Sequence, residues 1–300
     1  MTRGQEPVAT RFTVRGYSVI STGKGIDKRM GKMTSIVLAQ ARGIYAFRGF
    51  IMGSVKREFS LRYSNSMLGA AWLILQPLSQ ILIFTLVFSQ VLGSRLAGVP
   101  GTFSYSIFLC AGVLTWGFFS EIITRSQTVF LDYANLIKKI NFPRICLPVV
   151  VILNALTGFA IVFGLFTLFL VITGNFPGWK YAAIFPVLGI QIMFAIGLGI
   201  IIGILHVFFR DVGQFFTIVM QLWFWLTPIV YPLSTLPDWA AKLVRLNPIA
   251  PIAKAYQRVL VYGTAPVWGE LAPSFIIAVI FCIFAVLLFL RRAGEIVDEL

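Results

Sequence analysis

The sequence has few charged residues and few cysteines. Of its 300 residues, 12% are charged and 58% are hydrophobic, and the mean hydropathy is +0.87. This composition excludes a soluble enzyme, a disulfide-stabilised scaffold, a coiled coil and a disordered chain. The three cysteines, Cys110, Cys146 and Cys282, lie in apolar segments without C-x-x-C spacing. They are therefore interpreted as small buried hydrophobic residues, and they indicate no redox compartment.

Groups that bind phosphate, metal ions or coupling ions are also scarce. The sequence has one histidine, His206, and no G-x-x-x-x-G-K-[ST] loop, because Gly31-Lys32 is followed by Met33. No acidic residue lies deep in an apolar segment, where ion-coupled carriers usually place one. We therefore expect a chain that is not an enzyme, binds no cofactor or metal and hydrolyses no ATP.

Long uncharged segments are the main feature that is present. Six windows of at least 20 residues contain no Asp, Glu, Lys or Arg. A helix needs about 20 apolar residues to cross about 30 Å of hydrocarbon, whereas the strands of a membrane barrel alternate over about ten residues. We predict an all-α integral membrane protein with six transmembrane helices, near residues 68–92, 103–124, 145–173, 181–209, 212–231 and 271–290.

Two features of the spans concern helix packing. The third and fourth spans are longer than a bilayer requires, so we expect them to tilt, kink or protrude. Gly199 and Gly203 in the fourth span have the G-x-x-x-G spacing. This spacing predicts that another helix approaches closely at these two positions.

The basic residues predict the orientation. Nineteen of the 25 Lys and Arg residues precede the first span or lie on the same side, and six lie on the opposite side. The positive-inside rule then puts both termini in the cytoplasm of a protein in the cytoplasmic (inner) membrane. The net charge of +14 reflects this topology and attraction to anionic membrane lipids, and we expect no nucleic-acid binding.

Composition divides the chain into four parts. Residues 1-45 are expected to form a mobile, basic cytoplasmic arm, with a transit peptide as the alternative. Residues 46-66 are expected to form an amphipathic helix in the membrane interface, with an ordinary linker as the alternative. Residues 67-292 hold the six spans, and residues 293-300 form an acidic cytoplasmic tail.

Two segments outside the spans are rich in apolar residues. Residues 125–142 form the longest cytoplasmic loop, and its apolar side chains approximate one helical face. We expect a short helix there whose surface needs a partner, either protein or bilayer. Residues 232–270 contain five prolines, and two short helices broken near Asn247-Pro248 fit this pattern better than a hydrated loop.

Five local strings resemble the membrane subunits of ABC transporters that export polysaccharides, the O-antigen, capsule and teichoic-acid class. The order and spacing of these strings extend the resemblance over roughly residues 45 to 292. The strings are RYSNSMLGAAWLILQPL (62–78), LIKKINFPRICLP (136–148), FFRDVGQFF (208–216), LTPIVYP (226–232) and LNPIAPIAKAYQRVL (246–260).

The resemblance implies a homodimer bound to two copies of a separate nucleotide-binding ATPase, which holds ATP and Mg. A polyprenyl-pyrophosphate-linked glycan would pass between the two membrane subunits. Residues 233–265 resemble the family's paired outer gate helices. The positions that resemble its contacts with the ATPase are Phe59, Arg62, Phe130, Asp132, Tyr133, Leu136, Arg210 and Asp211.

Two sets of side chains are candidates for contact with the glycan lipid. Aromatic rings offer stacking faces to sugars, although helix packing and lipid contact explain most membrane aromatics. Basic residues three or four apart share a helix face and could meet a diphosphate, or could simply extend to water and headgroups. The candidates are Phe84, Phe88, Trp116, Phe119 and Trp223 for the rings, and Lys242, Arg245, Lys254 and Arg258 for the charges.

Two other functions stay open. The first is an ABC exporter subunit for lipid or drug cargo, which would have fewer aromatic residues along the dimer seam. The second is a membrane transferase acting on polyprenyl phosphate. A transferase needs a cluster of acidic or histidine residues near one interface, and Glu121, Asp132 and Asp211 are widely separated in the sequence.

Overall fold

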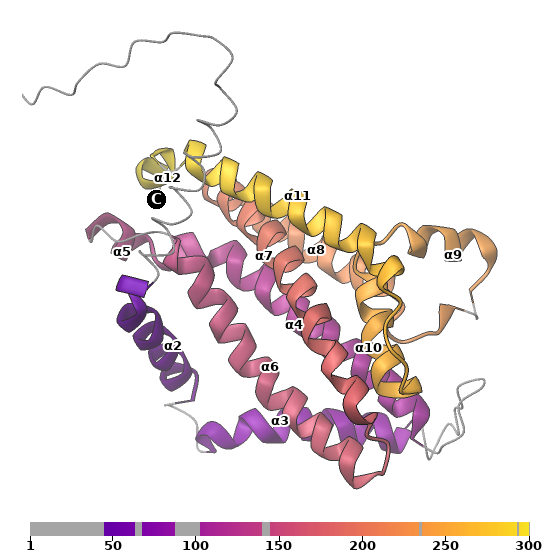
Figure 1. The fold of residues 1–300 in the computed structure, drawn as a ribbon. Helices are drawn as coiled ribbons and strands as arrows, with labels where there is room; N and C mark the ends of the chain where they lie inside the picture. The colour runs from indigo at the N-terminus through magenta and orange to yellow at the C-terminus, as the bar shows by residue number, and fades with distance from the viewer. Residues whose placement is uncertain are drawn as a thin grey trace, which may run out of the picture. The chain divides into compact units, whose positions relative to one another are not determined.

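In the computed structural model, every regular element among the described residues is a helix (Figure 1). This confirms the predicted all-α architecture. The described residues fall within a single unit, Ile44–Leu300. They are 45–63, 68–87, 103–139, 145–233, 236–292 and 294–299, so the expected arm lies almost entirely outside them.

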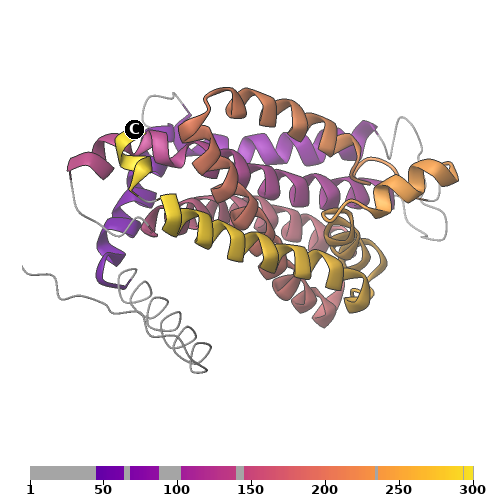
Figure 2. The same cartoon turned by 90° about the horizontal axis from the view of Figure 1, so that it is seen from above.

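Among the described residues, four helices are long and apolar enough to cross a membrane. They are α4 (Ser104–Asp132), α6 (Cys146–Ile172), α7 (Ile184–Phe208) with the 3-10 turn η3 (Gly178–Ala183) before it, and α11 (Trp268–Arg292). α11 lies along α7, and α4 lies on another side of α7 (Figures 1 and 2). The shorter helices are α2 (Arg48–Tyr63), α3 (Trp72–Phe84), α5 (Ala134–Lys139), α8 (Asp211–Trp225), α9 (Asp238–Arg245), α10 (Ala250–Tyr262) and α12 (Glu295–Glu299).

The expected first and fifth spans are shorter than predicted within the described residues. α3 has 13 residues, and the chain is described only as far as residue 87 after it. α8 has 15 residues, which is about 22 Å at about 1.5 Å per residue. The helix ends there because Pro228 disfavours helical geometry in the residue before it and has no N–H to donate. The described part of the chain therefore shows four helices of spanning length, whereas we predicted six spans.

α4 is longer than the predicted second span. It continues to Asp132, so the first part of the expected loop 125–142 is helical and belongs to one of the helices long enough to cross a membrane. The short helix that we expected follows as α5. The apolar face is largely turned inward: Phe130 is fully buried and its ring lies 6.1 Å from that of Phe289 in α11.

α7 is the central helix, and glycines let its neighbours approach its backbone. A Cβ atom built on Gly199 would lie 2.6 Å from the Cβ of Ser126 in α4, and one on Gly203 would clash with the Ser126 carbonyl oxygen. On the side of α11, a Cβ on Gly197 would lie 2.8 Å from the backbone nitrogen of Cys282. The close approach predicted from the G-x-x-x-G spacing is confirmed, with α4 as the partner helix.

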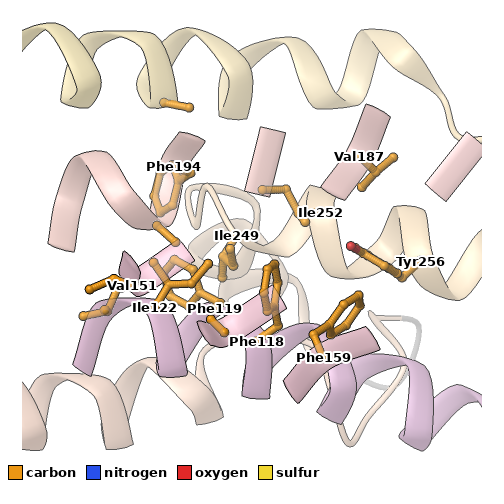
Figure 3. Packing of buried hydrophobic residues seen from close by; sticks show 14 of the residues in the cluster. Phe118, Phe119, Ile122, Val151, Phe159, Val187, Phe194, Ile249, Ile252 and Tyr256 are labelled. Atoms are coloured by element: carbon orange, nitrogen blue, oxygen red, sulfur yellow. The ribbon is translucent and has the colours of Figure 1, made fainter. Parts of the chain in front are cut away.

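The core extends from the long helices to α10. Figure 3 shows Ile249, Ile252 and Tyr256 pointing into the same cluster as Phe118 and Phe119 of α4. The two short helices predicted between spans five and six are present as α9 and α10, with the break at Asn247-Pro248. α10 is nevertheless a core element, since most of its side chains are buried.

The two ends of the long helices carry different short helices. α2, α5 and α12 lie at one end, called here the α5 end, and α9 and α10 lie at the other, called the α10 end (Figure 1). The expected acidic tail forms α12 at the α5 end, where Ile296 is fully buried and the helix packs against α7 and α5.

The glycine contacts predict how substitutions in α7 change stability. Gly203→Ala should lower the unfolding free energy by about 1–3 kcal/mol, because the new methyl group overlaps backbone atoms of α4. Gly189→Ala is the matched control, since nothing lies within 4 Å of its built Cβ. Melting temperatures of the two variants in detergent test this, and equal values would contradict the packing described here.

Candidate functional site

The segment after α8, residues 226–233, has an irregular backbone whose carbonyls are bonded by distant side chains. Three such bonds run from Asn247 Nδ2 to the Leu226 carbonyl (3.1 Å), from Gln257 Nε2 to that of Pro228 (3.1 Å) and from Tyr105 Oη to that of Val230 (2.8 Å). Lipid chains offer no hydrogen bonds, so an irregular backbone in a membrane protein needs partners of this kind. The three bonds hold the segment against α4 and α10.

Asn247 is the central residue of this junction. Its side-chain oxygen accepts a hydrogen bond from Trp223 Nε1 at 2.8 Å, and its Nδ2 lies 2.9 Å from the Thr227 hydroxyl oxygen. The residue is buried and joins the end of α8 to the start of α10. Sequence reasoning used Asn247 as a helix break and missed this role, although a lone Asn in an apolar segment was a visible signal.

Three of the five candidate aromatic residues meet in one cluster. The ring of Phe119 lies 5.5 Å from that of Trp116 and 5.5 Å from that of Trp223, and it is fully buried. Phe84 lies apart in α3, where its carbonyl accepts a hydrogen bond from Ser106 of α4. Phe88 lies outside the described residues.

A groove of about 350 Å³ runs between α4 and α8 beside this cluster. It combines polar and aromatic side chains, contributed by Trp116, Thr124, Gln127, Thr217, Met220, Gln221, Phe224 and Trp225. Gln214, Thr217 and Gln221 form an exposed stripe on α8, with spacings of three and four residues. Polar side chains on an apolar helix usually face a partner or a watery path. The stripe was readable in the sequence, but we did not predict it.

The candidate contacts with an ATPase gather at the α5 end but differ in exposure. Asp132, Arg210 and Asp211 are exposed, whereas Phe130 has no exposed surface for a partner to contact. The remaining described candidates are half-buried, namely Phe59, Tyr133 and Leu136. The side chain of Arg62 lies outside the described residues.

An ion-pair network ties α2 to the long helices. The Glu58 carboxylate of α2 accepts hydrogen bonds from Arg125 of α4 and from Asn154 of α6. Arg125 also pairs with Glu121, with 2.9 Å between Nε and Oε1. The Arg125 side chain is 22% exposed, so the pair is partly shielded from solvent. Sequence reasoning treated Glu121 as one of several widely separated acidic residues and missed this link.

The four candidate basic residues fall into two groups at the α10 end. Lys254 Nζ lies 2.7 Å from Glu270 Oε2, and Arg258 lies 3.6 Å from the other oxygen of the same carboxylate. Lys242 and Arg245, both exposed on α9, have no acidic partner among the described residues. The neutralising role of Glu270 was not predicted.

Comparison with known proteins assigns the family. The family model described as ABC-2 type transporter matches residues 51–261. The chain belongs to the ABC-2 type transporter family. The match includes α4, α6, α7, α8, the junction at Asn247 and nearly all of α10, whereas α11 with Glu270 lies beyond it.

Two relatives are similar in sequence to this ABC-2 chain over most of its length. The O-antigen export system permease protein RfbA of Myxococcus xanthus is 31% identical over 221 residues, which cover 73% of the chain and 82% of the relative. A permease of the same name from Klebsiella pneumoniae is 29% identical over 209 residues, covering 69% and 78%. The resemblance inferred from five strings is confirmed at the level of the family.

The Glu58 network predicts coupled effects on stability. Arg125→Met should lower the unfolding free energy by about 1–3 kcal/mol, because it removes the cation that pairs with both Glu58 and Glu121. The double change Arg125→Met with Glu58→Gln should lower the unfolding free energy by less than the sum of the two single changes, since the two residues share one interaction. Thermal unfolding in detergent measures this, with Arg57→Met on the exposed side of α2 as control. Strictly additive effects would contradict the network.

Proposed function

We propose that this chain is the transmembrane subunit of an ATP-driven exporter that moves a lipid-linked polysaccharide of the O-antigen type across the cytoplasmic membrane. The main support is family membership together with relatives named as O-antigen export permeases, which align with this chain over most of its length. Four apolar helices of spanning length agree with a membrane subunit.

In this proposal the α5 end faces the cytoplasm and binds a separate ATPase. Both termini are cytoplasmic in this topology, and two copies of the chain form a homodimer with two ATPase subunits that hold ATP and Mg. The exposed charges of Asp132, Arg210 and Asp211 form a polar rim suited to a protein contact. The network at Glu58 would transmit movement of α2 to α4 and α6, because it joins all three helices.

The glycan path in this proposal follows the α4–α8 groove. α8 exposes large apolar side chains beside its polar stripe, so a second copy of the chain could cover the apolar part and leave the stripe facing the cargo. Trp116 and Phe224 would then offer ring faces to sugars. α3 and α8 would belong to the two remaining crossings of each subunit. α9 and α10 would gate the outer exit.

Cargo and partner can be tested together in the native host. Deleting the chain should leave the glycan inside the cell, detected by lectin labelling after but not before permeabilisation. The wild-type chain should restore surface labelling. The double change Asp132→Arg with Arg210→Glu should not restore it and should reduce co-purification of the ATPase, since reversed charges oppose the contact.

Two controls decide how these results are interpreted. Lys180→Glu, at the opposite end in η3, should behave as wild type. Phe130→Ala should lower the melting temperature of the isolated chain, because it empties a buried position. Normal surface glycan in the deletion strain would refute the assigned cargo, and unchanged ATPase recovery with the double change would refute the assigned contact surface.

A further inference from the structure

Two cavities at the α10 end share a wall. One, of about 620 Å³, lies between α9, α10 and the start of α11. The other, of about 370 Å³, lies where α10 meets the start of α4 and residues 228–233. Lys254 lines both cavities. A single ammonium group therefore stands where the two spaces meet.

The larger cavity has the chemistry of a site for an anionic amphiphile. Val244, Pro251 and Ile277 supply apolar wall, while Arg245 and Lys254 supply positive charge. Glu270 is an acidic residue of the same lining, and it is engaged by Lys254. Such a cavity suits an apolar chain that ends in a phosphate.

The smaller cavity has the chemistry of a sugar site. Tyr231 and Tyr262 contribute aromatic rings, and Gln257, Arg258 and Thr264 contribute polar groups. Rings pack against the apolar face of a sugar, and amide, guanidinium and hydroxyl groups bond its hydroxyls. Gln257 is buried and bonded to the Pro228 carbonyl, so it is held in place before any ligand arrives.

The charges of the two linings do not balance. Three basic residues, Arg245, Lys254 and Arg258, accompany one acid, Glu270, which pairs with the last two. Arg245 has no acidic partner within the part of the chain that the structure describes. A phosphate at this position would accept hydrogen bonds from Arg245 and would compete with Glu270 for the ammonium group of Lys254.

We propose that the two cavities form one binding site for a glycosylated lipid phosphate. The apolar chain occupies the larger cavity, the phosphate meets Arg245 and Lys254, and the first sugar lies against Tyr231 and Tyr262. Glu270 pairs with Lys254 and Arg258 when the ligand is absent. This inference rests on the proposed function for its ligand class, and it adds Glu270, Tyr231 and Tyr262 to the basic residues that the sequence had already suggested.

Binding to the full chain in complex with its ATPase tests the site. The complex is held in nanodiscs of phosphatidylcholine without ATP, and binding is titrated with three probes. These are polyprenyl pyrophosphate carrying a disaccharide, the same lipid without sugar, and phosphatidylglycerol. We expect the sugar-bearing probe to bind most tightly and phosphatidylglycerol least tightly.

Four variants separate the parts of the site. Arg245→Ala should lower the affinity for both polyprenyl probes by about tenfold, the loss expected for a charge-assisted hydrogen bond. Tyr262→Ala should weaken only the sugar-bearing probe, by about threefold to tenfold. Glu270→Gln should tighten both polyprenyl probes, because it removes the competing carboxylate. Lys242→Ala is the matched control, since Lys242 lines neither cavity.

Arg245→Ala and Glu270→Gln are expected to change the binding affinity in opposite directions, which distinguishes the proposal from a general loss of folding. A variant that merely disturbs folding cannot tighten binding, so a tightened Glu270→Gln supports a ligand-competing carboxylate. Equal binding of phosphatidylglycerol, or equal effects of Arg245→Ala and Lys242→Ala, would overturn the site. Export is measured separately from binding. A complex that exports glycan but shows either of these binding results would refute this site and leave the proposed function intact.

Discussion

The close contact of α7 with α4 and α11 is the constraint on which the rest of the structure depends. Three glycines on α7 bring neighbouring backbones nearer than any larger residue would allow. Within lipid, where apolar side chains gain little by leaving the solvent, such contacts are a main source of helix association. α10 packs against α4 and α7, so this contact also determines where the α10 end and its cavities lie.

Polar groups are arranged under a second constraint, the lack of hydrogen-bond partners in hydrocarbon. Gln191 Nε2 of α7 donates to the Thr115 carbonyl of α4 at 2.7 Å, and Asn247 joins α8 to α10, so these buried amides stabilise helix packing. Polar groups that stay exposed, such as Gln214 and Gln221 on α8, do not stabilise the subunit in this way. Their exposure is the physical reason for placing the path beside them.

Local signals in the sequence predicted much of the fold. Uncharged length predicted the four long helices, and the glycine spacing predicted the contact of α7. The proline pattern predicted α9 and α10 with their break at Asn247-Pro248. Length alone could not show that α8 stops at Trp225, because Pro228 ends the helix and side chains from α4 and α10 bond the irregular segment after it. The burial of Phe130 likewise depends on α11, which lies far along the sequence.

The candidate site was less predictable, because its groups come from distant segments. The rings of Trp116 and Trp223 lie 6.4 Å apart, and this contact requires α4 and α8 to lie side by side. The pairing of Lys254 and Arg258 with Glu270 joins α10 to the first turn of α11. Spacing along one helix showed which basic residues share a face. It did not show which acidic residue pairs with them.

The most direct test of the account is ATP-driven transport by the purified complex. Proteoliposomes would carry the chain and its ATPase with the nucleotide sites outward, and a fluorescent polyprenyl-pyrophosphate-linked glycan in the outer leaflet. An impermeant glycosidase added after ATP should cleave less glycan than one added without ATP, because the transported glycan is protected inside. Full cleavage in both cases, while the ATPase hydrolyses ATP, would contradict the claim that this chain exports a lipid-linked polysaccharide.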